Sequence, residues 1–139
     1  MSELEKKLER FRSLGREMRL QLLLDYARKL PALPDELLAA RDQGLGRVEE
    51  CQTPLFVWVG VEDGLVRIHA DAPPESPTVR GFVSFLMSVL NGQPAAVVAE
   101  LPEDVMERMG LGEVLGMMRT QGLGSVVRRI KRDVARALA

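Results

Sequence analysis

Cysteine and histidine are almost absent from this sequence, since Cys51 and His69 are the only residues of either kind. A lone cysteine cannot close a disulfide within the chain. One cysteine and one histidine also fall short of the four ligands that structural zinc sites use. The sequence therefore predicts no disulfide and no bound metal. A single cysteine is also typical of the reducing cytoplasm, where we expect the protein to reside.

Long apolar segments and cofactor motifs are missing as well. No apolar run approaches the ~18 residues that cross a bilayer, and the longest covers only residues 55–61. The charged N-terminus has no signal-peptide segment. Neither a GxGxxG nor a GxxxxGK[ST] motif follows a strand-like run, and no lysine motif suggests a covalent pyridoxal site. We expect no membrane partner and no cofactor.

The charge pattern gives little support to nucleic-acid binding. The net charge is −1, although residues 112–139 carry six basic groups against two acidic ones. Single-stranded nucleic acids are usually bound by aromatic side chains interleaved with basic ones. No aromatic residue follows Phe85, so the basic C-terminal segment is predicted to be a solvated helix face rather than an RNA-binding surface.

Periodicity predicts one α+β domain that spans residues 1–139. A capping box at residues 2–5 opens a first helix, and Gly15 separates it from a second helix that ends before Pro31. Strand-like runs follow, joined by an Asp63-Gly64 turn, and Val48 starts a third edge strand. Further helices are expected over residues 77–90, 94–99, 103–109 and 123–138. The prediction is a small, about three-stranded antiparallel sheet, its first long strand buried on both faces, with helices mainly on one face of the sheet.

Cys51 is the main candidate for chemistry, because its polar neighbours are typical of a surface loop. Three interpretations remain open: a structural thiol in an interaction module, a nucleophile in a free-standing thiol enzyme, and an acceptor of an activated group. The enzyme would need a Cys51–His69 pair, but strand alternation already explains His69 as a solvent-facing residue. Glu49 and Glu50 disfavour a thiolate, which suits an acceptor of activated sulfur better.

Four stretches of the sequence together resemble the SufE family. They are Tyr-Ala-Arg-Lys-Leu-Pro-Ala-Leu-Pro at 26–34, Val-Glu-Glu-Cys-Gln-Thr at 48–53, Ala-Asp at 70–71 with Thr-Val-Arg-Gly-Phe at 78–82, and Met-Arg-Thr-Gln-Gly-Leu at 118–123. The Cys-Gln and Arg-x-x-Gly-Leu elements are the specific ones. Glu50 and Thr53 depart from the family's glycine and serine, and residues 73–77 look like an insertion.

The resemblance implies a SufE/IscU-like fold and a role in iron–sulfur cluster assembly. In that family, a pyridoxal-phosphate cysteine desulfurase of the SufS or CsdA type forms a persulfide. The acceptor takes its outer sulfur and passes it to a SufBCD scaffold, and it has no turnover of its own. Cys51 would be the acceptor, while Gln52, Asp71 and Arg119 match positions near the cysteine or the partner interface. Arg119 would stabilise a persulfide anion.

A carrier thiol that is left open would oxidise or lose its sulfur. We therefore expect the free protein to shelter Cys51. Gly44 and Gly46 lie a few residues upstream and are candidate hinges for moving the thiol outward.

Overall fold

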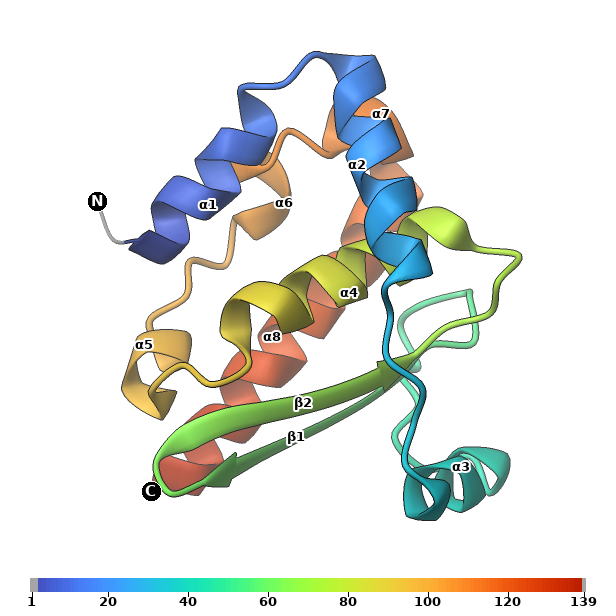
Figure 1. Ribbon diagram of the computed structural model, residues 1–139, viewed down its shortest axis with the longest axis vertical. Coiled ribbons are helices and arrows are strands. Elements are labelled where there is room, and N and C mark those ends of the chain that lie inside the picture. The colour runs from blue at the N-terminus through green and yellow to red at the C-terminus, as the bar shows by residue number, and fades with distance from the viewer. Residues whose placement is uncertain (1–2, 139) are drawn as a thin grey trace.

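In the computed structural model, which describes residues 3–138, helices pack mainly on one face of a β-hairpin (Figure 1). In chain order the elements are α1 (Glu3–Arg12), α2 (Arg16–Arg28), α3 (Asp35–Asp42), β1 (Phe56–Glu62), β2 (Leu65–Asp71), α4 (Pro77–Leu90), α5 (Ala95–Ala99), α6 (Val105–Arg108), α7 (Gly112–Leu115) and α8 (Met117–Leu138). The predicted helix breaks at Gly15 and before Pro31 are confirmed. The capping box relies on Ser2, which lies outside the described residues.

The hairpin pairs β1 with β2 in antiparallel register, from Phe56 opposite Asp71 to Glu62 opposite Leu65. Asp63 and Gly64 have positive φ angles of 53° and 79°, as expected for a two-residue turn that matches the twist of the strands. The inward residues of β2 alternate with exposed ones, as predicted. The prediction that β1 is buried on both faces was wrong, because Gly60 is exposed and, of residues 56–61, only Val57 is fully buried.

A third strand is not formed within the described residues. Arg47 makes only an isolated antiparallel bridge with Phe56. Beside it, the Val48 amide donates to the Leu55 carbonyl at 2.8 Å, and the Val57 amide donates to the Gly46 carbonyl at 2.9 Å. The chain turns away after Val48 to form the loop that carries Cys51, and this ends the pairing. The predicted α+β class is thus confirmed with a two-stranded sheet.

Two helices, α4 and α8, lie across one face of the hairpin (Figure 1). They cover the side that carries Val66, Ile68 and Ala70, all of which are buried. Helix α2 packs on α4 from the other side. A Cβ atom at Gly81 would collide with the Leu23 carbonyl, so this crossing requires glycine. These contacts place α4 at the centre of the molecule.

Helix α8 begins at Met117, six residues before the predicted start. Its apolar stripe is buried from Leu123 to Val134, whereas Leu138 near the end of the helix is 52% exposed. Residues 117–122 lack the apolar periodicity of the rest of the helix because their side chains face solvent or the loop that carries Cys51. Within residues 3–138, no helix is both long and apolar enough to cross a membrane.

Candidate thiol site

The Cys51 loop runs from Val48 to Leu55, immediately before β1. Both of these residues are completely buried, and the hydrogen bond between them closes the base of the loop. From α8, the Arg129 guanidinium donates from Nη1 to the Arg47 carbonyl at 2.7 Å. The base of the loop is therefore fixed to both the sheet and α8.

The tip of the loop points its polar side chains outward and its thiol inward. Glu50 and Gln52 are exposed, whereas Cys51 is only 7% exposed and contributes to the apolar core. The Cys51 amide donates to the Val48 carbonyl at 3.2 Å, which is typical of a tight turn. The prediction that the free protein shelters this thiol is confirmed.

Both glycines upstream of the loop adopt positive φ angles of 80°. At Gly46 the Trp58 indole occupies the place of a side chain, since a Cβ atom there would lie 2.5 Å from the ring. Gly44 has open space around it. The backbone therefore requires glycine at Gly46 for both its conformation and its contact. Hinge movement at these positions stays a prediction.

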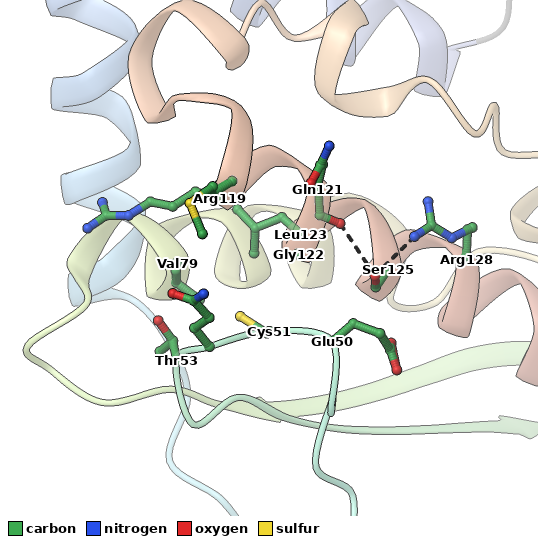
Figure 2. Close-up of a pocket in the computed structure, with 12 residues that line it drawn as sticks. Glu50, Cys51, Thr53, Val79, Arg119, Gln121, Gly122, Leu123, Ser125 and Arg128 are labelled. Carbon is green, nitrogen blue, oxygen red and sulfur yellow. Dashed lines mark hydrogen bonds between the residues drawn. The ribbon is translucent and has the colours of Figure 1, made fainter.

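Cys51 lies in a pocket of about 580 Å³ between its own loop and the beginning of α8. Figure 2 shows its sulfur pointing toward α8, in the region of Gly122 and Leu123. We call this the Cys51 pocket, and it is lined by Glu50, Cys51, Gln52, Thr53, Val79, Met118, Arg119, Gln121, Gly122, Leu123, Ser125 and Arg128. Cys51, Gln52 and Arg119, which the sequence singled out, are thus brought together.

Two arginines of α8 lie at opposite ends of the Cys51 pocket (Figure 2). Arg119 donates to the Thr78 hydroxyl at 3.1 Å and is turned toward the start of α4. Arg128 donates to the Ser125 hydroxyl at 3.0 Å. Neither arginine forms an ion pair with another of residues 3–138. Because their partners are neutral hydroxyls, both guanidinium groups keep their charge available for an anion.

Asp71 lies outside the Cys51 pocket, at the end of β2. Its carboxylate accepts a hydrogen bond from Arg41 at 2.8 Å, and Arg80 approaches it to 3.8 Å. Arg80 also donates to the Ala72 carbonyl. Hydrogen bonds to Asp71 and then Asp42 raise the pKa of Arg41 above its ordinary value. We call Asp71, Arg41 and Arg80 the Asp71 cluster; a role for Asp71 in partner binding stays a prediction.

His69 does not join the site. It is exposed on the outer face of β2, opposite Trp58 of β1. Neighbouring Ile68 and Ala70 point into the core, so His69 faces away from it. It does not line the Cys51 pocket. The structure thus lacks the Cys–His pair that a thiol enzyme would use.

Sequence reasoning missed several residues of the pocket, chiefly Val79, Ser125 and Arg128. The polar residues Gln121, Ser125 and Arg128 recur at helical spacing, which would have placed them on one face. That face was overlooked because the expected start at residue 123 left Gln121 outside the helix. Among the described residues, no cluster of three or more His, Cys, Asp or Glu side chains could hold a metal.

A small α+β protein that shelters one thiol in a pocket at the tip of a loop is the class that this fold and site define. The family model for the SufE Fe-S metabolism associated domain matches residues 5–134. The chain therefore belongs to the SufE family, as its motifs indicated.

Relatives agree with this assignment. An uncharacterised SufE-like protein of Mycobacterium tuberculosis is 42% identical over 120 residues, which cover 86% of this chain and 82% of that protein. The sulfur acceptor protein CsdE of Escherichia coli is 32% identical over 108 residues, covering 75% of this chain and 68% of CsdE. The solution structure of a hypothetical protein from Thermus thermophilus superposes with a TM-score of 0.81 at 39% identity. That match covers 97% of this chain and 95% of the Thermus chain.

Proposed function

We propose that this protein accepts sulfur on Cys51 for iron–sulfur cluster assembly in the cytoplasm. The donor is a SufS- or CsdA-type cysteine desulfurase, which holds the pyridoxal phosphate, and the recipient is a SufBCD-type scaffold. One observation carries the proposal: the only thiol is sheltered in a pocket between two arginines that have no acidic partner among residues 3–138. Family membership and similarity to a protein named as a sulfur acceptor support it.

The transfer is a thiol–persulfide exchange that needs no oxidant. The Cys51 thiolate attacks the outer sulfur of the desulfurase persulfide. A new sulfur–sulfur bond forms on Cys51 as the bond in the donor breaks, and the donor cysteine leaves as a thiolate. The outer sulfur keeps its oxidation state, and any proton on it travels with it.

The pocket suits an acceptor better than a free-standing enzyme. Attack on an inert carbonyl would need a base close to the thiol, and the only histidine lies on the outer face of β2. A persulfide is already activated, so the acceptor needs only a thiolate and a means of balancing negative charge. Arg119 supplies that charge at the pocket, and exposed Gln52 offers an amide to the partner beside the thiol.

Desulfurase turnover measured with the host's own enzyme tests this function. Sulfide release from cysteine should rise when the wild-type protein is added, and the protein alone should show none. Cys51→Ser should abolish the stimulation, whereas His69→Ala should retain it. Full stimulation by Cys51→Ser would indicate an interaction module with a structural cysteine, and turnover by the protein alone that His69→Ala abolishes would indicate a thiol enzyme.

A further inference from the structure

Gly122 of α8 lies beside the Cys51 thiol and lines the Cys51 pocket. A Cβ atom built on Gly122 would lie 3.5 Å from the Cys51 Cα, 3.7 Å from the Cys51 Sγ and 3.7 Å from the Glu50 carbonyl oxygen. These are ordinary van der Waals distances, so alanine would fit here while the thiol is unmodified. The absence of a side chain at Gly122 is therefore not required by the resting structure.

Glycine at this position is costly for the helix. It lies inside α8, where glycine makes the helix less stable than alanine would, because the glycine backbone loses more conformational freedom on folding. It is also buried. Neither the backbone conformation nor the contact with the unmodified thiol requires glycine at position 122. The space that glycine leaves beside the Cys51 sulfur is a reason for its presence.

A persulfide needs more room than a thiol. Its outer sulfur lies about 2 Å beyond the first, and the Cys51 side chain points toward α8 (Figure 2). A methyl group on residue 122 would already touch Sγ at 3.7 Å, so it would take up space next to the sulfur on the side that faces α8. The other walls nearby are formed by larger side chains, including Val79 and Leu123.

We propose that Gly122 provides the space in which the outer sulfur of a Cys51 persulfide rests, so that the loaded protein can keep its loop closed. This inference rests on the proposed function of Cys51 as a sulfur acceptor. It makes Gly122 a determinant of sulfur retention: the thiol would be sheltered with or without the space, but the persulfide only with it.

Gly124 provides a matched control in the same helix. It is buried like Gly122, but a Cβ atom there would meet only the Arg128 Nη1 atom, at 3.4 Å. That atom is the end of a flexible side chain and can move. Gly122→Ala and Gly124→Ala thus add the same methyl group to the same helix, with and without contact to Cys51.

The test loads Cys51 chemically, so that it does not depend on a desulfurase. Cys51 is first converted to a mixed disulfide with thionitrobenzoate. Hydrosulfide then displaces thionitrobenzoate and leaves the Cys51 persulfide, and intact mass confirms the loading. Cyanide removes the outer sulfur as thiocyanate and returns the Cys51 thiolate, so the rate of thiocyanate release reports how well the outer sulfur is sheltered.

We expect Gly122→Ala to release thiocyanate about tenfold faster than the wild type, because one surplus methyl group strains a closed pocket by that order. Gly124→Ala should release it at the wild-type rate. Alkylation of the unloaded thiol should be equally slow in all three proteins, and thermal unfolding should show that both variants fold. Equal thiocyanate release from the two folded variants would overturn the proposal, and so would faster alkylation of unloaded Gly122→Ala.

Failure of the proposed function would give a different pattern. The chemically loaded proteins would still differ in thiocyanate release, but none of them would take up sulfur from the host desulfurase and cysteine. Failure of the inference alone would leave enzymatic loading intact and remove the difference between Gly122→Ala and Gly124→Ala.

Discussion

The Asp71 cluster and the Cys51 pocket each hold two arginines, but the arginines differ in their partners. In the Asp71 cluster, a carboxylate lies within 4 Å of both guanidinium groups. In the Cys51 pocket, Arg119 and Arg128 donate hydrogen bonds to the hydroxyls of Thr78 and Ser125, and neither forms an ion pair within residues 3–138. Both arginines of the first group share a carboxylate partner, whereas both arginines of the second have only hydroxyl partners and lie beside a sheltered thiol.

The difference indicates separate roles for the half-buried arginines of the Asp71 cluster and the exposed arginines of the Cys51 pocket. Removing one partner of a formed ion pair leaves the other charge uncompensated, which lowers stability. Removing a guanidinium that has only a neutral partner leaves no charge behind, so stability changes little. Its removal then weakens the binding of any anion that the guanidinium group would have contacted. The predictions below test whether stability and sulfur transfer separate in this way.

The largest expected effect concerns the sheltered thiol itself. Free Cys51 should react with iodoacetamide on the order of a hundredfold more slowly than the same protein unfolded in urea, because reaction requires local opening of the loop. Adding a desulfurase whose own thiol has been blocked should raise the rate by drawing Cys51 out. A free thiol that reacts as fast as the unfolded one, with no response to the partner, would rule out a sheltered carrier.

Arg119→Ala should lower the rate of sulfur acceptance from the desulfurase on the order of tenfold, because a charge-assisted contact to sulfur or to a partner carboxylate is lost. Its unfolding midpoint should match that of the wild type. Arg136→Ala is the control, since Arg136 is exposed on the last helix away from the pocket. Equal rates for the two variants would refute a role for Arg119.

Asp71→Asn should have the opposite pattern to Arg119→Ala, with a larger effect on stability than on sulfur transfer. We expect it to lower the free energy of unfolding by about 1 kcal/mol, because Arg41 and Arg80 both lose their carboxylate. If Asp71 also supports partner binding, as its family position implies, sulfur acceptance should fall only about threefold. Asp42→Asn is the control, because Asp42 contacts the same Arg41 from a more exposed position. Urea unfolding should then show the larger loss for Asp71→Asn.

The sequence predicted the functional cysteine and the family of the protein more reliably than the residues that surround the cysteine. Cys51, Gln52 and Arg119 carry residue-specific motifs, and the structure brings all three into one pocket. The hairpin turn was also predictable, because Asp63-Gly64 is a local signal with a local cause. Features that depend on a few neighbouring residues could thus be inferred without a structure.

Features that depend on tertiary packing could not be inferred from the sequence. The predicted third strand does not form, because the chain turns away after Val48 into the loop that carries Cys51. The beginning of α8 was missed because residues 117–122 face the pocket and solvent rather than the apolar core. Ser125 and Arg128 were also not predicted as residues of the Cys51 pocket. The ion pair between Asp71 and Arg41 joins residues 30 positions apart in the sequence, and no local pattern signals it.

The mass of the protein after incubation with the host desulfurase and free cysteine tests the central claim most directly. The intact wild-type protein should gain one sulfur atom, about 32 Da, as expected for persulfidation of a cysteine. Peptide mapping should place that sulfur on Cys51, and reduction should remove it. Cys51→Ser treated in the same way should keep its original mass. An unchanged wild-type mass, or the same gain in Cys51→Ser, would contradict the account.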